Sequence, residues 1–497
     1  MSNDISTDLL EKFSQIGLKL TAEKDVNKLL ELILTECIKI TDSDAGSIYI
    51  KEQVEENPQI IFMYTFNTSM SFPFKSFKMP INMNSISGAC AMTGDIYNFK
   101  SMSDTLEILG FHHNRSFDES YGYKTCNMLV IPLKNYSNEI IGVLQLINKK
   151  IDPTFRFTAY SNDFVTHVTP YGVSDEKIVG ALASQAAMLI ERGILFNDIE
   201  HLLDSMIDTL VTALDSRDPI TAGHSKRVAN YAVALAKTVN LVDYGPYADF
   251  FFSEDALKEL YIAGMLHDVG KIGVREYVLM KRNKLSDDCI DLIRWRYKYI
   301  SRLISESSEL ATSVNFTPET LKETLSKLEA INIGGFLKDE DCDLLNTLKE
   351  LTIADPEGSV VPFLTPEEYE FMSVARGNLT SRERKEINDH AIHTFNILNG
   401  IEWTRNLKLV PRIAADHHEK LNGAGYPEGR DAAHLEMRSR ILAVADVFDA
   451  LTAKDRPYKP AIPIPKSIEI LEDDASKGGL DADLVVIFKN ERAYERI

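Results

Sequence analysis

The first part of the chain changes from helical spacing of apolar residues to a series of short apolar runs. Between Asp8 and Ile40 the apolar positions recur at helical spacing, with an interruption near Thr21 to Asp25, which predicts two helices. The short runs that follow are separated by turn-rich pieces, and they predict an antiparallel sheet flanked by helices, an α+β domain. These runs are Gly46–Lys51, Gln59–Tyr64, Ile96–Phe99, Met128–Leu133 and Ile140–Ile147. The stretch Asp152–Tyr171 has no clear period and is predicted to be an inserted loop.

A heptad repeat follows this region and predicts a linker helix over residues 176–214. Apolar residues return every seven positions, and a second set lies three residues after the last three of them. The first set is Leu182, Leu189, Phe196, Leu203 and Leu210, and the second is Ile199, Met206 and Ala213. The pattern favours a parallel homodimer through residues 182–210. The alternative is one amphipathic helix packed on its own domain.

Composition and charge exclude several classes of protein. In 497 residues, Asp plus Glu outnumber Lys plus Arg by 74 to 54, and the net charge of -20 argues against binding of a nucleic acid polymer. Five scattered cysteines indicate neither a disulfide framework nor a thiolate zinc site, and they fit the reducing cytoplasm. No basic stretch followed by an apolar one opens the chain, and no run of about 18 apolar residues occurs, so we expect no membrane segment.

Histidines and carboxylates gather in the second half, which is helical in pattern. Seven of the 11 histidines lie between His224 and His434. Each one alone is more often a core residue than a ligand. Together, however, five imidazoles and two carboxylates on apolar helices, without thiolates, predict a metal site with nitrogen and oxygen ligands. These side chains are His224, His267, Asp268, His390, His417, His418 and Asp446.

Local spacing predicts which helical face carries each of these side chains. His267 and Lys271 are four residues apart, so they share a face if the turn stays helical. Thr380 and Glu383 have the spacing of a capping box and predict a helix on which Ile387, His390, Thr394 and Ile397 line the inward face, with His393 on an adjacent face. Seven ligands with Asp268 bridging would make roughly eight metal bonds, about four for each of two ions. Two divalent ions are therefore expected, iron or manganese first, with zinc or nickel also compatible.

The N-terminal region resembles a GAF sensor domain. The resemblance rests on DAGSIYI at Asp44–Ile50, on SISGACAMTGDIYNF at Ser85–Phe99 and on the segment Tyr121–Lys149. It implies a GAF-like sensor over residues 1–175. Phe117, Asp118, Glu119 and the run Tyr121–Thr125 are similar to the segment that GAF domains of cyclic-nucleotide enzymes place beside their ligand, so an unknown small ligand is one reading. A structural or dimerising role is the other.

The remainder resembles the HD-GYP family of cyclic di-GMP phosphodiesterases. The motifs are HDVGKIGV at His267–Val274, HHE with GYP over His417–Pro427, and ILAVADVFDALT continuing to DRPYK at Lys459. The resemblance implies an all-α HD-GYP domain over 215–497, the seven metal ligands named above, and contacts of Lys271, Arg456 and Lys459 with substrate. It also implies a metal-bridging hydroxide that attacks cyclic di-GMP to give pGpG or GMP, with Asp268 and Lys271 as catalytic residues. A signalling protein partner at the GYP loop is a further implication.

Three positions depart from the family pattern. Ile220 stands where members with a third metal have Glu, and Asn422 stands where Asp is usual, which could weaken the loop or the affinity for substrate. A helical insertion at about 303–377 is the third departure, and it is either a cover for the core or a lid over the site. Two other functions stay open: a cyclic di-GMP receptor without hydrolysis, and a phosphodiesterase for another cyclic dinucleotide.

Overall fold

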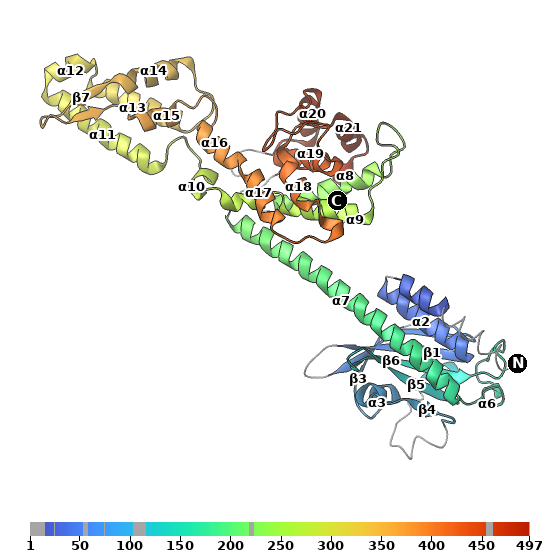
Figure 1. The fold of residues 1–497 in the computed structure, drawn as a ribbon. Coiled ribbons are helices and arrows are strands. Elements are labelled where there is room, and N and C mark those ends of the chain that lie inside the picture. Colours follow the sequence, from blue (N-terminus) through green and yellow to red (C-terminus); the bar gives the residue numbers. More distant parts are fainter. Residues whose placement is uncertain are drawn as a thin grey trace. The chain divides into compact units, whose positions relative to one another are not determined.

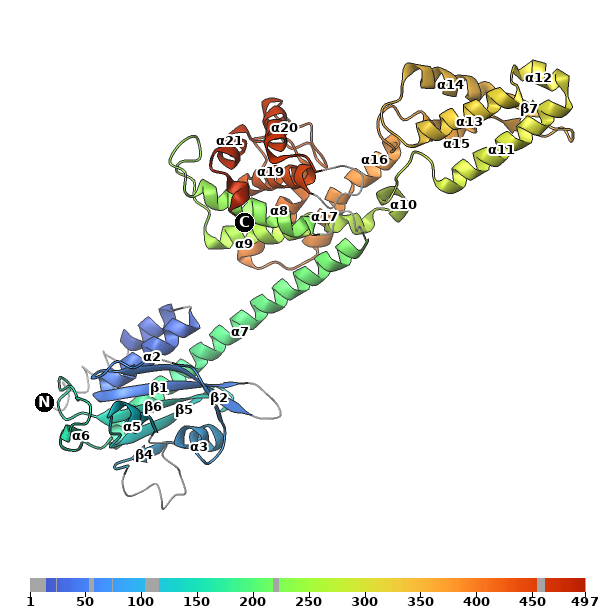
Figure 2. The same ribbon diagram turned by 180° about the vertical axis from the view of Figure 1, so that it is seen from behind.

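A computed structural model describes residues 15–23, 25–52, 58–73, 75–102, 116–217, 223–453 and 461–496 (Figures 1 and 2). The chain divides into two compact units, Met1–Leu203 and Asp204–Ile497. The boundary falls inside one long helix, α7 (Val173–Arg217). Leu9 and Phe13 of the first predicted helix lie outside the described residues, and the backbone is helical over 15–22.

The first unit is built on an antiparallel sheet, as the sequence predicts, and the sheet has six strands. The strand order is β3-β2-β1-β6-β5-β4, so the first and last long strands, β1 and β6, pair at the centre. The edge strand β3 was not predicted. The elements are α2 (Val26–Thr41), β1 (Ser43–Glu52), β2 (Gln59–Asn67), β3 (Lys78–Pro80), α3 (Ile86–Thr93), β4 (Tyr97–Phe99), α5 (Ser116–Tyr121), β5 (Met128–Lys134), β6 (Ile140–Lys149) and α6 (Asp163–Thr166).

Helices cover the sheet because its two faces each carry apolar side chains. Residues of α2 and the first turns of α7 share one core with β1, β5 and β6, whereas α3 packs into a separate core against the same strands. The segment Asp152–Tyr171 is largely irregular, as the predicted loop requires, but it is not a mere surface loop. This segment contains α6, buries Phe157 and Phe164, and places the hydroxyl of Tyr171 2.8 Å from that of Ser43. Its aromatic residues supply core volume without a helical or strand period.

A cavity of about 580 Å³ opens in the first unit beside the predicted ligand segment. Tyr49, Phe62, Tyr121 and Tyr123 contribute aromatic walls. Gln145 lies at its polar side, where its Oε1 accepts hydrogen bonds from the hydroxyls of Tyr49 at 3.1 Å and Ser87 at 3.2 Å. Asp118 of the predicted segment lines the cavity and accepts a hydrogen bond from the backbone N–H of Thr125 at 2.9 Å.

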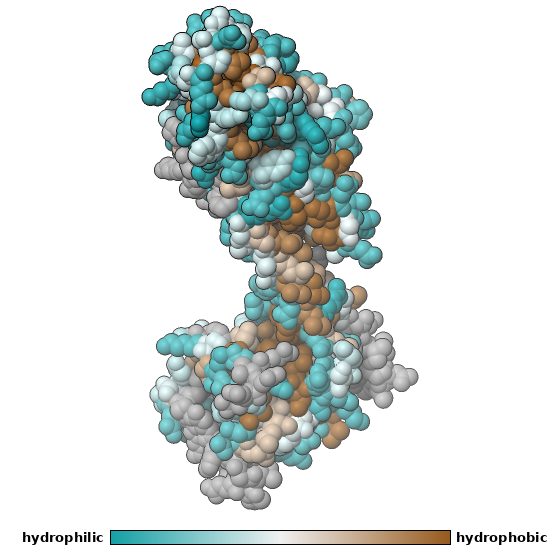
Figure 3. Space-filling model, turned by 90° about the vertical axis from the view of Figure 1, so that its left-hand side faces the viewer, coloured by the Kyte–Doolittle hydropathy of each residue, from teal (hydrophilic) through white to brown (hydrophobic). Residues whose placement is uncertain are grey.

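The linker helix α7 is exposed over part of its heptad seam. Leu182 does not start that seam as predicted, because it is 1% exposed in the core of the first unit. Further along, Phe196, Ile199, Met206 and Leu210 are 60, 64, 57 and 42% exposed. Figure 3 shows apolar side chains following α7. Against expectation, α7 is also long and apolar enough to cross a membrane, a weak indication because core helices pass the same test.

The second unit is a bundle of helices, in agreement with the predicted all-α domain. Helix α8 packs on α9 and α19, and Gly264 permits the close approach of α9, since a Cβ there would lie 2.8 Å from the Cα of Ala229. The bundle elements are α8 (His224–Val239), α9 (Glu254–Leu266), η2 (Val269–Gly273), α10 (Glu276–Leu279), α16 (Ser381–Asn388), α17 (His390–Asn399), η3 (Arg405–Leu407), α18 (Val410–Ala415), η4 (Asp416–His418), α19 (Met437–Thr452), α20 (Ile464–Ser476), α21 (Ala482–Asn490) and η5 (Ala493–Glu495).

The insertion forms a small module with its own core and is not wholly helical. Its hydrophobic cluster runs from Leu285 to Met372, so the module begins earlier than the predicted residue 303. The buried ammonium of Lys284 joins its two ends by donating to the carbonyls of Met372 and Val374 at 2.8 Å. The elements are α11 (Asp287–Glu306), α12 (Ser308–Val314), α13 (Pro318–Asn332), α14 (Asp339–Glu350), the hairpin β7 (Thr352–Ala354) and β8 (Val360–Pro362), and α15 (Pro366–Met372).

Candidate metal centre

The structure brings the seven predicted ligand residues together in the second unit. They come from separated positions at the beginning of α8, the end of α9, the beginning of α17, the turn η4 and the middle of α19. Six of the seven are buried, and His418 is half-buried. Most sit where a helix starts or ends, so that the imidazoles project beyond the helix into a shared space.

The first group comprises His224, His267 and Asp268, whose ligand atoms all lie within 4.8 Å of one another. Asp268 Oδ2 is 3.4 Å from His267 Nε2 and 3.9 Å from His224 Nε2. Asp446 reaches the same group from α19, with its Oδ1 3.1 Å from His224 Nε2 and 3.8 Å from His267 Nε2. Two carboxylates and two imidazoles thus surround one small volume.

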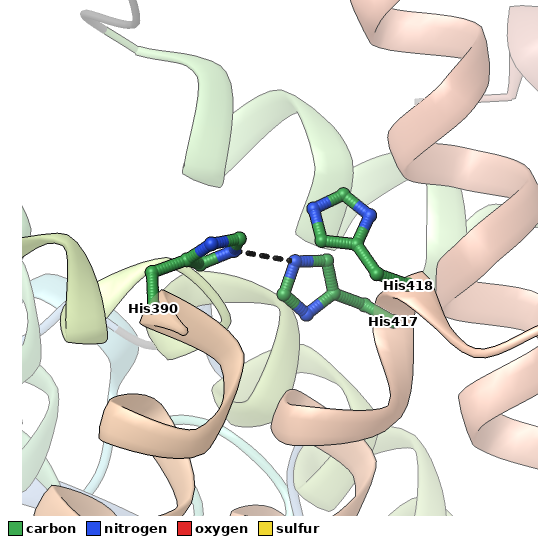
Figure 4. Close-up of side chains that lie close together, drawn as sticks. All are labelled: His390, His417 and His418. Carbon is green, nitrogen blue, oxygen red and sulfur yellow. Dashed lines mark hydrogen bonds between the residues drawn. The ribbon is translucent and has the colours of Figure 1, made fainter. Parts of the chain in front are cut away.

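The second group comprises His390, His417 and His418, again within 4.8 Å. Figure 4 shows His390 facing His417 across a gap, with the ring of His418 beside that of His417. The Nε2 atoms of His390 and His417 are 3.4 Å apart. Asp268 also links the two groups, because its other oxygen, Oδ1, is 3.4 Å from His390 Nε2. A carboxylate in this position would be able to serve ions held by both groups.

Hydrogen bonds fix the orientation of four of the five imidazoles. The Nδ1 atoms of His267, His390 and His417 each lie 2.6–2.7 Å from the backbone carbonyl three residues earlier. His224 differs, because its Nδ1 is 2.7 Å from Asp449 Oδ2. A carbonyl oxygen can accept a hydrogen bond only from a protonated Nδ1. In the three rings bonded to carbonyls, the lone pair for a metal is therefore that of Nε2, which is directed toward the centre.

Burial and charge leave most of these imidazoles neutral. Burial holds the pKa of His390 below its ordinary value and that of His417 well below it, and it lowers the pKa of His418 to about 4. Burial also acts to lower the pKa of His224, but hydrogen bonds to Asp446 and Asp449 outweigh it and raise that pKa to about 9. A positive charge between these carboxylates is therefore strongly favoured, which a divalent cation would also provide.

One buried atom tests whether the residues fit a metal. His267 is 0% exposed, and its Nε2 has no hydrogen-bond partner among the described residues. An unsatisfied buried polar atom costs roughly 1–3 kcal/mol unless another partner compensates it. Burial raises the pKa of Asp268, but Lys271 and His267 more than reverse this and hold the pKa well below its usual range. Neutral nitrogens and ionised carboxylates are the donors that a divalent cation takes.

The turn after His267 differs from the sequence expectation. It is the 3₁₀ turn η2, which begins directly after Asp268, so Lys271 does not share a helical face with His267. Instead its ammonium lies 2.8 Å from Asp268 Oδ2. The hydroxyl of Thr394 accepts from the N–H of Gly270 and donates to the carbonyl of His267, both at 2.9 Å. Thr394 thereby fastens α17, which carries His390, to the turn that carries Asp268.

The predicted helix around His390 is interrupted. Thr380 caps α16 with Glu383, as predicted, but the chain leaves the helix at Asp389 and His390 begins α17. Ile397 is 41% exposed and therefore does not line the inward face. His393 belongs to neither group, and its ring lies beside Gly273, where an added Cβ would meet it at 2.8 Å.

Sequence reasoning missed Asp449 and the surroundings of Tyr426. Asp449 is 1% exposed and follows Asp446 by three residues on α19, a spacing that places both carboxylates on one face. The ring of Tyr426, from the GYP stretch, lies 4.7 Å from that of His418. Arg456, Lys459 and Ile220 lie outside the described residues.

The GYP loop is held by backbone contacts. The buried carboxylate of Glu419 accepts hydrogen bonds from the N–H groups of Glu428, Gly429 and Arg430 at 2.7–3.1 Å. The amide of Asn422 donates to the carbonyl of Lys477 at 2.9 Å and accepts from the N–H of Ala424 at 3.0 Å. Asn422 therefore uses both amide atoms to shape the loop, as expected of an amide that keeps the shape of aspartate without its charge.

Comparison with known families identifies both kinds of domain in the chain. A GAF domain matches residues 25–190, and two HD domain models match residues 221–314 and 363–484. The chain therefore contains a GAF domain followed by an HD domain. The gap between the HD matches falls within the inserted module.

Curated relatives of the chain are cyclic dinucleotide phosphodiesterases by name. The 3'3'-cGAMP-specific phosphodiesterase 3 of Vibrio cholerae is 26% identical over 275 residues, 54% of this chain and 36% of the relative. The 3'3'-cGAMP-specific phosphodiesterase 1 of the same organism is 40% identical over 300 residues, 60% of this chain and 44% of the relative. The cyclic di-GMP phosphodiesterase response regulator RpfG of Xanthomonas campestris is 30% identical over 208 residues, 38% of this chain and 54% of the relative. The chain thus spans about half or less of the length of these relatives.

Proposed function

We propose that this protein is a metal-dependent phosphodiesterase that hydrolyses a cyclic dinucleotide under the control of its GAF domain. The observation that carries the proposal is the position of Asp268, whose two carboxylate oxygens approach His267 and His390, each at 3.4 Å. A carboxylate that belongs to the first three-residue group and also approaches the second suits two cations held close together. Two-metal sites of this kind serve in-line displacement at phosphorus.

When bound, divalent cations supply Lewis acidity toward water and phosphate oxygens. The chain's own residues hold these cations and shape the charge around them. The imidazoles of the second group present neutral Nε2 atoms, Asp268 and Asp446 supply negative charge, and Lys271 adds a positive charge beside Asp268. We propose that the Lys271 ammonium stabilises the charge that develops on a phosphate oxygen, and that Arg456 and Lys459 hold the remainder of the substrate.

Cyclic di-GMP is the first candidate substrate, and 3'3'-cGAMP is the second. The HD-GYP motifs support the former. The names of two relatives, one of them 40% identical, favour the latter. The two compounds differ in one base, whereas the metal centre acts on the phosphodiester they share. The groups that contact the bases therefore decide between them. A receptor that binds without hydrolysis is the remaining alternative.

Iron or manganese is the proposed metal, with zinc or nickel as alternatives. The described donors are imidazole nitrogens and carboxylate oxygens, a set that suits these ions. The five cysteines are free, and none belongs to either three-residue group. We also place the protein in the cytoplasm, in keeping with those free thiols.

Further partners are proposed from exposed or hollow parts of the structure. A parallel homodimer would cover the exposed seam of α7 from Phe196 to Leu210. A small ligand would occupy the cavity lined by Tyr49, Phe62 and Gln145 in the GAF domain. The GYP loop around Tyr426 is the proposed surface for a signalling protein.

The test compares hydrolysis of both cyclic dinucleotides by protein purified without oxygen, with metal content measured in the same samples. We expect a linear dinucleotide or mononucleotides from the metal-loaded protein and none from Asp268→Ala, which removes the bridging carboxylate. His434→Ala is the control, because this histidine is exposed and pairs with Asp431 away from the centre. Binding of about two ions without products from either compound would favour the receptor.

A further inference from the structure

We propose that Asp215 and Arg217, in the last turn of α7, are positioning residues for the first group of the metal centre, His224, His267 and Asp268. The inference rests on the proposed function, because it concerns the ions that this function requires. The end of the linker helix would then position the first group through hydrogen bonds to its backbone.

The contacts are hydrogen bonds from α7 to the backbone on either side of that group. The guanidinium of Arg217 donates to the carbonyl of Ile272 at 2.6 Å and to the carbonyl of Val274 at 2.7 Å. Ile272 belongs to the turn η2, which follows Asp268 directly and includes Lys271. A bidentate, charged donor fixes both the position and the direction of these carbonyls.

Asp215 makes the corresponding contact on the other side. Its Oδ2 accepts a hydrogen bond from the N–H of Gly223 at 2.8 Å. Gly223 is the N-cap of α8, has a φ of 72°, and offers no side chain to cap the helix itself. The carboxylate of Asp215 thus satisfies the backbone N–H of the residue that begins α8, and the next residue is His224. Two neighbouring side chains of one helical turn thus hold both segments that carry the first group.

The second group has no equivalent contact with α7 among the described residues. His390 and His417 are oriented by carbonyls of Ile387 and Ala414 in their own segments. The α17 segment is tied to η2 through Thr394. A shift of the last turn of α7 would act first on His224 and Asp268, while the imidazoles of the second group keep their local supports. The expected result is unequal loss of the two ions.

The experiment measures stepwise binding of Mn²⁺ to the full chain at equilibrium. In Arg217→Ala and Asp215→Ala we expect the affinity of one ion to fall about 10- to 100-fold, the range for groups that orient metal ligands, while the other ion stays at its wild-type affinity. The matched control is Ser216→Ala, since the exposed hydroxyl of Ser216 donates to the carbonyl of Thr212 in its own helix. Its two affinities should equal those of the wild type.

Conservative variants separate positioning from folding. Asp215→Asn keeps a carbonyl acceptor and Arg217→Lys keeps one charged donor, so both should recover part of the lost affinity. Unchanged binding of both ions in the alanine variants, or equal weakening of both, would overturn the inference. If an alanine variant does not fold, the Mn²⁺ titration is made with Asp215→Asn and Arg217→Lys instead. Unchanged binding of both ions in Arg217→Lys, or equal weakening of both, would then overturn the inference. A wild-type protein that binds no ions would instead refute the proposed function.

Discussion

Replacing Asp449 with asparagine tests how the centre holds His224. Asp449 is almost completely buried, and its carboxylate accepts hydrogen bonds from His224 Nδ1 at 2.7 Å and from Arg227 Nε at 2.7 Å. Asparagine has nearly the same shape and can accept from one of these donors. It removes the negative charge that both donors share, so the imidazole loses its electrostatic support while the packing stays similar.

The magnitude follows from the contacts. A hydrogen bond to a charged group contributes about 1.5–3 kcal/mol, more than a neutral one. Loss of an outer carboxylate from a metal-bound imidazole lowers metal affinity about 10- to 100-fold, which corresponds to about 1.4–2.7 kcal/mol. The two figures agree. We therefore expect Asp449→Asn to weaken binding of one ion by this factor and to lower hydrolysis at limiting metal.

The assay is Mn²⁺ titration of wild type and variant, with hydrolysis measured at low and saturating metal. Asp431→Asn is the matched control, because Asp431 pairs with His434 Nδ1 at 2.6 Å on the surface, where both side chains are more than half exposed. The control should bind both ions as the wild type does. An Asp449→Asn variant with wild-type affinity for both ions would refute the reasoning that this carboxylate supports His224.

Three further changes probe the frame around the centre. Gly270→Ala would drive a Cβ into the His390 carbonyl, so we expect chemical denaturation to show a loss of at least about 2 kcal/mol of stability. The control is Gly180→Ala, which has open space around the new Cβ and should gain up to about 1 kcal/mol. Equal denaturation midpoints for the two variants would contradict this expectation. Hydrogen bonds from Arg412 and Arg430 lower the pKa of Glu428 to about 2, so the contribution of this carboxylate to folding stability is present above pH 4.5 and is lost as the pH falls toward 2. The difference in unfolding free energy between wild type and Glu428→Gln should therefore shrink between pH 7 and pH 3. A difference that stays constant over this range would contradict the assigned ion pairs. Asn422→Asp removes the donor to Lys477, so kcat/KM should fall or stay level, and a clear rise would restore the hypothesis that asparagine weakens this site.

The sequence predicts elements better than it predicts their ends. The short apolar runs of the first unit form strands because nearly continuous apolar runs, such as those of β5 and β6, suit a sheet covered on both faces. The heptad pattern predicts α7, but it does not show that Leu182 is used by the core of the first unit. A heptad pattern shows which positions are apolar, but it does not show which part of the protein covers them. For the same reason Asp152–Tyr171, which has no period, was not recognised as part of the core.

The assembly of the metal centre was less accessible to sequence reasoning. Composition and spacing indicate buried histidines, but the family resemblance supplied the set of seven. Spacing placed Lys271 over His267, whereas the 3₁₀ turn rotates it to Asp268. A helix and a 3₁₀ turn differ little in sequence preference, and the choice here depends on Thr394, which is remote in sequence and bonds to Gly270.

The insertion explains why the contact between η2 and α17 decides the geometry of the centre. His224, His267 and Asp268 precede the inserted module, and His390, His417, His418 and Asp446 follow it, so the chain between the two sets passes through a module with a core of its own. Chain connectivity therefore does little to hold the sets in register. Thr394 and Gly270 supply that register instead, since a side chain at Gly270 has no room and the Thr394 hydroxyl bonds both to Gly270 and to the carbonyl of His267. The HD domain can accept a long insertion at this point because its ligand sets are joined by packing rather than by a short loop.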